Sequence, residues 1–176
     1  MSNWDKNLFI DHLRDQCSRE VAKVGVSIID FTEKHADDIS WGRGTDHGTL
    51  TFRCNSDAGP LPLFHMTSTG QLNLQINFMR NKEIPPMVLR DVVLKLESNF
   101  LRDYDAIEYP SDVFVPMNEL FHTENQVEKF LKTMEGATYR LRQKIFYTIS
   151  ILAPGIFWGF FISFTVVIGF SNYFNK

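Results

Sequence analysis

The sequence is poor in the residue patterns that mark secreted, metal-binding and catalytic proteins. Its 176 residues include two cysteines, Cys17 and Cys54, which lie far apart in the chain and share no motif. A secreted domain held by disulfides would need more cysteines in pairs. The N-terminal stretch MSNWDKNLFIDHLRDQ has no uninterrupted apolar segment, so it does not predict a secretory signal. We therefore expect reduced thiols in a cytosolic domain.

The sequence also lacks an excess of charge of one sign. Its 18 Lys and Arg residues stand against 21 Asp and Glu residues, which gives a net charge of −3. This balance does not indicate a general attraction to nucleic acid or to acidic membranes. The charges are unevenly distributed, because Lys176 is the only charged residue after position 144. The end of the sequence therefore differs in composition from the rest.

Metal-ligand spacing is absent from the sequence. No two of the five histidines stand in a metal-binding motif with each other or with a cysteine. These histidines are His12, His35, His47, His65 and His122. We expect no metal and no cofactor.

The glycine-rich stretch WGRGTDHG (41–48) does not match a phosphate-binding loop. It has neither the spacing nor the lysine of a P-loop, and it leads into a strand pattern where a dinucleotide site would need a helix. We interpret it as a connection between strands. Arg43, Asp46 and His47 near its tip are candidate ligand contacts.

No constellation of carboxylates predicts catalysis. The acidic pairs around Asp37, Asp103 and Asp112 lie in or beside loops, where capping or solvation explains them. A magnesium nuclease of the restriction type would place acids on a strand where this sequence has Gln75 and Asn77. We therefore assign no catalytic residue.

Hydrophobic periodicity predicts about three helices. The first covers residues 5–35, with a break expected near Gly25 or Ile28. Prolines 85 and 86 open the second, which covers residues 86–100. The capping box formed by Thr123 and Gln126 opens the third, and the pattern allows this helix to continue into the apolar residues that follow.

Between the first two helices the period of the pattern changes to two. Turn-rich stretches separate three predicted strands at 49–54, 61–66 and 71–78, with residues 39–41 as a candidate fourth and 113–115 as a short candidate. The predicted fold class is α+β, with an antiparallel meander of three to four strands packed on about three helices.

Alternation in the predicted strand 71–78 places four amide side chains on one face. Gln71, Asn73, Gln75 and Asn77 would then face water or a ligand, because the intervening residues are apolar. Amides both donate and accept hydrogen bonds, so the row could read sugar or base edges. A solvated sheet face is the alternative interpretation. At a sheet edge, the row could also pair with another chain.

Residues 145–170 form an apolar run without a single charge. A bilayer core requires about 20 apolar residues, so the run predicts one C-terminal transmembrane helix, with a buried helix or a hydrophobic hairpin as the alternative. Arg140, Arg142 and Lys144 precede the run, which predicts that residues 1–144 are cytosolic. The prediction is a tail-anchored, single-pass membrane protein in which residues 171–176 form a short tail.

Small residues recur within the apolar run at helical spacing. Gly155, Gly159 and Ser163 are four residues apart and would form one ridge on a helix. Such a ridge allows a second helix to approach closely, so a homo-oligomer through this segment is a candidate assembly. The alternative is a chance match, because glycine and serine are common in membrane helices.

Part of the sequence resembles a known domain. Trp41, Gly44 and Gly48 precede a strand, the segment LFHMTSTGQLNLQINF (63–78) follows, and a helix opens near His122. This order resembles a small uncharacterised bacterial domain with a WGxG motif and a β-meander, found beside nuclease domains in restriction- and defence-associated proteins. The resemblance covers roughly residues 5–143 and implies no catalytic residues.

The sequence predicts a non-enzymatic binding or assembly module held at a membrane. One alternative is a nucleic-acid-associated accessory protein of a bacterial defence system, with Arg43, Arg53, Arg80 and Lys82 contacting phosphates. The other is a membrane-disrupting effector that is gated by its cytosolic domain.

Overall fold

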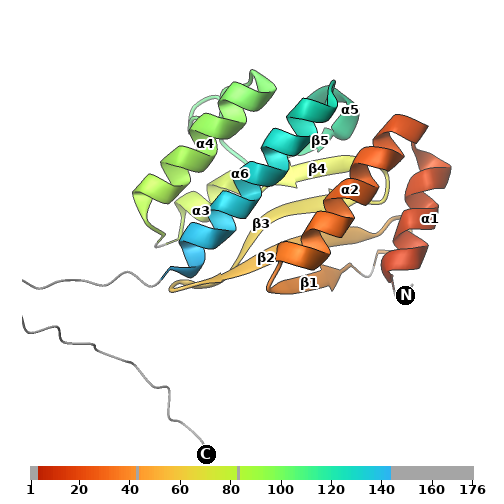
Figure 1. The fold of residues 1–176 in the computed structure, drawn as a ribbon, viewed down its shortest axis with the longest axis horizontal. Helices are drawn as coiled ribbons and strands as arrows, with labels where there is room; N and C mark the ends of the chain where they lie inside the picture. Colours follow the sequence, from red (N-terminus) through yellow and green to blue (C-terminus); the bar gives the residue numbers. More distant parts are fainter. Residues whose placement is uncertain (1–3, 43, 83, 144–176) are drawn as a thin grey trace, which may run out of the picture. The chain divides into compact units, whose positions relative to one another are not determined.

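The computed structural model describes residues 4–42, 44–82 and 84–143, which belong to one compact unit. Within these ranges lie six helices and a five-stranded antiparallel sheet (Figure 1). None of the helices in this part of the chain combines the length and the apolar character that a bilayer crossing requires. The apolar run 145–170, with Gly155, Gly159 and Ser163, lies outside the described residues.

The sheet follows the order of the chain. Its strands lie side by side as β1-β2-β3-β4-β5, and every neighbouring pair is antiparallel. The strands are β1 (Asp38–Trp41), β2 (Thr49–Ser56), β3 (Gly59–Thr67), β4 (Gln71–Leu74) and β5 (Phe114–Pro116). The predicted α+β class and antiparallel meander are confirmed. The predicted numbers are too low, because the described residues form five strands and six helices where three to four strands and about three helices were expected. Both short candidate strands join the sheet.

The helices contribute a second layer. They are α1 (Lys6–Gln16), α2 (Arg19–His35), α3 (Ile76–Arg80), α4 (Pro86–Phe100), α5 (Met117–Leu120) and α6 (Glu124–Arg142). Figure 1 shows α2 and α6 crossing the same face of the sheet, with α4 flanking α6. The predicted helix 86–100 has the predicted bounds, with Pro86 in its first turn.

A chain of aromatic rings joins the two layers. Phe31 of α2 stacks on Phe52 of β2 at 5.8 Å between ring centroids, and Phe52 stacks on Phe64 of β3 at 5.1 Å. Phe64 then meets Phe130 of α6 at 5.6 Å, and Phe130 lies 6.1 Å from Phe100 of α4. Phe52, Phe64 and Phe130 are fully buried. The core therefore lies between the sheet and the helices α2 and α6.

The predicted helix 5–35 is two helices, and the break is not where glycine and β-branched residues suggested. It falls at Cys17 and Ser18, where the Ser18 hydroxyl accepts a hydrogen bond from Val21 N and caps α2. Gly25 is buried inside α2 because Leu13 of α1 packs over it. A Cβ at position 25 would lie 2.5 Å from Leu13 Cδ2.

The predicted strand 71–78 is also wrong beyond Leu74. Residues Ile76–Arg80 form α3, and both carboxylate oxygens of Asp112 accept hydrogen bonds at its start, from Asn77 N at 2.8 Å and Phe78 N at 3.0 Å. A carboxylate stabilises the N-terminus of a helix through its free N–H groups and its dipole. The alternating pattern therefore ends because a residue 35 positions away supplies a cap.

The two ends of α6 differ in how well the sequence predicted them. The capping box is confirmed, because the Thr123 hydroxyl accepts from Gln126 N while Gln126 Oε1 accepts from Thr123 N. The expectation that the helix continues beyond Arg140 fails soon afterwards, because Gln143 has an extended backbone with φ −71° and ψ 118°. Arg142 donates at that point to His35 O at 2.6 Å, which fastens the end of α6 to α2.

Phe64 is the ring through which the sheet meets α6, so its removal should strongly destabilise the domain. Phe64→Ala should lower the free energy of unfolding of residues 1–143 by about 3–5 kcal/mol, because a large cavity remains. Urea unfolding followed by circular dichroism measures this. The exposed Leu94→Ala is the control and should change the free energy by less than about 0.5 kcal/mol. Equal effects would contradict the assigned core.

Candidate functional site

The face of the sheet away from α2 and α6 carries a row of side chains, one from each strand. We call this set the polar row after four of its members, Ser40, Thr51, His65 and Asn73. The fifth member, at the β5 end of the row, is Phe114. Each member is the direct register partner of the next, so all project to the same face. Phe52 follows Thr51 and Phe64 precedes His65, so both rings point to the opposite face, towards the helices, as the alternation of a strand requires.

His65 lies at the centre of the polar row. Its Nδ1 lies 2.8 Å from Thr51 Oγ1, and its ring is hydrogen-bonded to the Gln75 side chain. Burial lowers the pKa of His65 below its ordinary value, and the nearby Arg53 lowers it further. The Gln75 hydrogen bond and the negative charge of Asp112 oppose this effect without reversing it. The imidazole is therefore neutral near pH 7 and offers one donor and one acceptor.

Arg53 supplies the positive charge beside the row. Its Nη1 donates to Asp38 Oδ2 at 2.9 Å and to Ser40 Oγ at 2.8 Å. The sheet register shifts between Phe52 and Arg53, which marks a β-bulge at this point. About 31% of the Arg53 side chain remains exposed, so the guanidinium is held in position but is still accessible.

The predicted solvent-facing row of four amides is not present. Asn73 and Gln75 are buried, at 5% and 8% exposure, and Gln75 Nε2 donates to Asn73 Oδ1. Asn77 lies on α3, where it donates to Tyr109 O at 3.0 Å and accepts from Arg80. Gln71 is half-buried on β4. The structure therefore brings Asn73 and Gln75 to His65 and gives Asn77 a role in holding the loop before β5.

The candidate contacts of the glycine-rich connection lie elsewhere. Arg43 is outside the described residues, while Asp46 and His47 are exposed between β1 and β2. Asp46 Oδ1 accepts a hydrogen bond from Thr45 Oγ1 at 3.1 Å. Among the described residues, neither Asp46 nor His47 hydrogen-bonds to the polar row, so these two sets of candidates do not form one site.

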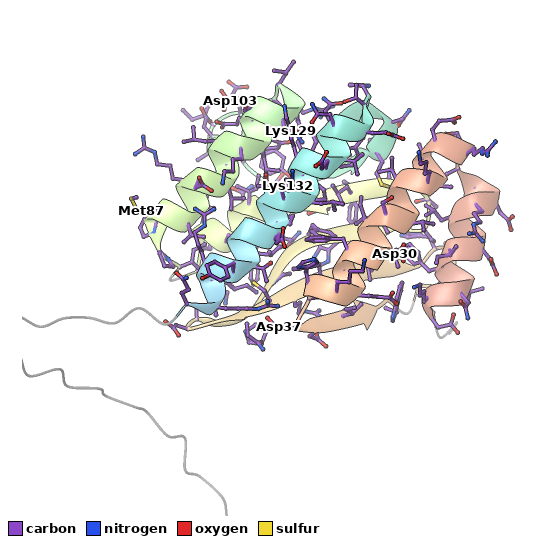
Figure 2. The ribbon with its side chains drawn as sticks, in the orientation of Figure 1. Asp30, Asp37, Met87, Asp103, Lys129 and Lys132 are labelled. Atoms are coloured by element: carbon purple, nitrogen blue, oxygen red, sulfur yellow. The ribbon has the colours of Figure 1, made fainter. Side chains whose placement is uncertain are left out.

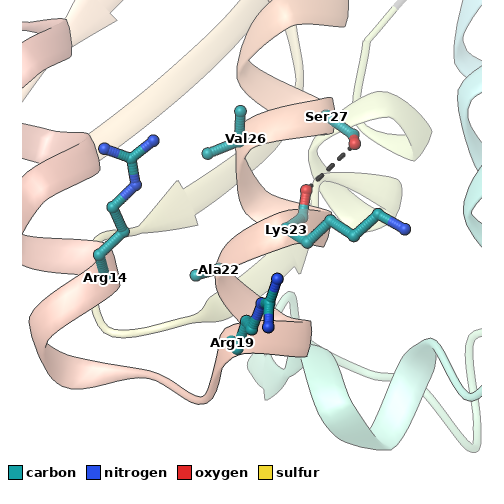
Figure 3. Close-up of a pocket in the computed structure, with 6 residues that line it drawn as sticks. All are labelled: Arg14, Arg19, Ala22, Lys23, Val26 and Ser27. Carbon is teal, nitrogen blue, oxygen red and sulfur yellow. Dashed lines mark hydrogen bonds between the residues drawn. The ribbon is translucent and has the colours of Figure 1, made fainter.

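A basic groove between α1 and α2 is a second concave feature. Its volume is about 520 Å³, and it is lined by Arg14, Arg19, Ala22, Lys23, Val26 and Ser27 (Figure 3). Lys23 forms an ion pair with Glu124 at 2.5 Å, and Arg14 lies 3.9 Å from Asp11. These pairs are exposed and therefore contribute little to stability. The groove could accept an anion, but two of its cations already have acidic neighbours.

Among the described residues, no group of three or more His, Cys, Asp or Glu side chains is close enough to hold a metal ion.

The sequence alone does not predict most of the polar row. Thr51 and His65 stand at polar positions of alternating strands, but only the register reveals that they face each other. Arg53 was named as a phosphate contact, whereas the structure pairs it with Asp38.

Comparisons with known proteins add no assignment. No protein-family model matches the chain, and no match was found among curated proteins or among solved structures.

The neutral state of His65 predicts a specific pH dependence of stability. The pKa of folded His65 lies below its ordinary value of 6.5, so the unfolded chain binds the proton first as the pH falls. The contribution of His65 to the free energy of unfolding is fully present above the unfolded pKa of 6.5, and it is lost as the pH falls from there towards the folded pKa. The free energy of unfolding should therefore decrease between about pH 7.5 and about pH 5.5, and His65→Gln should reduce the decrease.

Chemical denaturation at the two pH values measures this difference. The pKa values of Asp37 and Asp91 are lowered from 3.8, so these carboxylates titrate below the window. His47→Gln is the matched control because its side chain is exposed, and it should leave the loss of stability unchanged. The same pH dependence in the wild type and in His65→Gln would show that another group is responsible.

Proposed function

We propose that the chain is a non-enzymatic binding module tethered to a membrane, and that the polar row with Arg53 is its ligand-contact surface. The observation that supports this most is the combination of groups on one rigid sheet. Two hydroxyls, a neutral imidazole, an amide and a phenyl ring stand in register, with a guanidinium beside them. Functional groups placed on strands hold their geometry better than groups on loops.

The accessible parts of this surface suggest the class of ligand. Phe114 is 43% exposed and offers a flat apolar face at one end of the row. Arg53 keeps part of its guanidinium accessible near the other end. A ligand with a planar group to stack on Phe114 and an acceptor to meet Arg53 would use both.

The burial of Thr51 favours binding over catalysis. A hydroxyl 2.8 Å from an imidazole could in principle act as a nucleophile with its base. Thr51, however, is only 6% exposed in the middle of the sheet. The Thr51 hydroxyl therefore presents too little surface to attack a substrate carbonyl. The Thr51–His65 pair is better explained as a contact that positions the imidazole, while Arg53 and Phe114 provide the accessible contacts.

The membrane part of the proposal depends on sequence alone. The run 145–170 is long enough to cross a bilayer and carries no charge. Arg140 and Arg142 immediately precede it, which favours a cytosolic position for residues 1–144. The proposed localisation is a membrane with the described domain on its cytosolic side.

A nucleic-acid-associated accessory protein is the second candidate, and the basic groove favours it. Arg14, Arg19 and Lys23 would supply the phosphate contacts. Arg53 and Arg80 give this candidate less support than the sequence suggested, because each already has a partner. Arg53 pairs with Asp38, and Arg80 donates to Tyr104 O. The third candidate, a membrane-disrupting effector, depends on the ridge at Gly155, Gly159 and Ser163, which lies outside the described residues.

Site-specific photocrosslinking tests the contact surface. Placing p-benzoylphenylalanine at Phe114 in the full chain should yield one discrete adduct by intact mass spectrometry, because a ligand on the polar row lies against this ring. Arg53→Ala should abolish the adduct, whereas Lys129→Ala, which removes an exposed cation from α6, should not. The same probe at exposed Leu94 is the positional control. Identical adducts from both positions would refute the assigned surface.

Alkaline carbonate extraction tests the tether. The full chain should remain in the membrane pellet, because an integral apolar segment resists extraction, and a chain that ends at Gln143 should appear in the supernatant. Release of the full chain would contradict the tether. Retention of the shortened chain would show that another part of the protein holds it at the membrane.

A further inference from the structure

We propose that one end of the domain, which we call the exit end, docks on the lipid headgroups. The exit end comprises Met87 and Arg90 on α4, Tyr139 on α6 and Lys34 on α2. This inference rests on the proposed membrane tether and names the surface that would meet the bilayer. Its occupant is the lipid surface itself, in particular one that contains anionic headgroups.

Ion pairs show that three helix ends meet at this place. Arg140 near the end of α6 pairs with Asp91 in the second turn of α4. Arg142 pairs with Asp37 at 2.9 Å and donates to His35 O, which brings the end of α2 to the same point. Figure 2 shows Met87 at this end of α4 and Asp103 beyond the opposite end. The chain therefore leaves the domain among the start of α4 and the ends of α2 and α6.

The connector to the apolar run is very short. Only Gln143 and Lys144 separate α6 from Ile145, the first residue of the run. An extended chain spans at most about 3.6 Å per residue, so this connector reaches roughly 10 Å. That reach is close to the Debye length of about 8 Å at physiological salt. If the run enters the bilayer as proposed, the connector keeps Arg142, the last residue of α6, within about that distance of the headgroups.

The side chains of the exit end suit an interface. Met87 is 79% exposed and Tyr139 is 66% exposed, although both carry large apolar surfaces. They belong to adjacent helices, with Tyr139 next to Arg140 and Met87 one turn before Asp91. A tyrosine places its ring in the apolar boundary and its hydroxyl in water, and methionine adapts to irregular surroundings. Contact with the headgroup zone would remove both from water.

The charges of the exit end also favour contact with an anionic membrane surface. Arg142 pairs with Asp37, and Asp91 is shared between Arg140 and Lys95, so these three cations face two carboxylates. Arg90 and Lys34 are exposed and form no ion pair among the described residues. A basic side chain near an anionic membrane contributes about 1 kcal/mol of attraction. These two side chains would therefore hold the exit end on a surface that the short connector already brings close.

A depth measurement in vesicles tests the docking. The full chain is reconstituted into vesicles of phosphatidylcholine and phosphatidylserine that contain a lipid with a nickel-chelating headgroup. A nitroxide is attached to Met87→Cys, or to the control Leu101→Cys at the other end of α4. Both native positions are exposed, at 79% and 88%, so neither substitution should disturb folding. Cys17 is replaced by serine, and Cys54 stays, because burial raises the pKa of Cys54 to about 12 and keeps its thiol unreactive.

The expected result is a much stronger nickel-induced relaxation at position 87 than at position 101. The two sites are 14 residues apart, or about 21 Å along the helix, so the difference should be at least about threefold. Equal relaxation at both sites, or stronger relaxation at 101, would overturn the docking. Replacing Arg90 and Lys34 by glutamine should reduce the relaxation at 87, and an unchanged value would also count against the proposal.

The same vesicles distinguish a failure of the docking from a failure of the membrane tether. Carbonate extraction is carried out on a separate portion of the labelled vesicles, because alkaline carbonate would itself disrupt the electrostatic contacts under test. If the chain stays in the vesicles while positions 87 and 101 relax equally, the tether stands and the docking fails. If carbonate releases the chain, the tether fails, and the docking fails with it.

Discussion

The stacked rings of Phe52 and Phe64 form the interaction on which the rest of the fold depends. They lie 5.1 Å apart on neighbouring strands, with Phe31 on one side and Phe130 on the other. Through these contacts α2 and α6 are held against one face of the sheet. Such large aromatic side chains dominate core energetics. The polar row lies on the other face because the same strands turn their aromatic residues towards the helices.

The two faces are linked by the period of the strand. His65 follows Phe64, and Thr51 precedes Phe52, so each strand places a polar group on one side and a ring on the other. A slip by one residue would move every ring to the wrong face. Selection for the core register therefore also fixes the register of Ser40, Thr51 and His65. The bulge at Arg53 changes the local geometry without disturbing the Phe52–Phe64 pair.

Local signals explain what the sequence could predict. The period of two located β2 and β3, Pro86 marked the start of α4, and Thr123 with Gln126 marked the start of α6. The errors arose where distant residues decide the local structure. Asp112 ends the pattern of β4 by capping α3, and Leu13 makes Gly25 a packing position. The polar row needed the register of five strands, which no single segment contains.

The position of α6 at the end of the described domain has a consequence for synthesis of the chain. Phe52 and Phe64 are made early, but Phe130, which covers Phe64, arrives only with α6. At about 5–20 residues per second, the roughly 70 residues from the end of β4 to the end of α6 require about 3–14 seconds. During that time the sheet exposes apolar rings, and the apolar run 145–170 follows almost at once. Chaperones would therefore meet this nascent chain first, and, if the run enters a membrane as proposed, the insertion machinery would meet it soon afterwards.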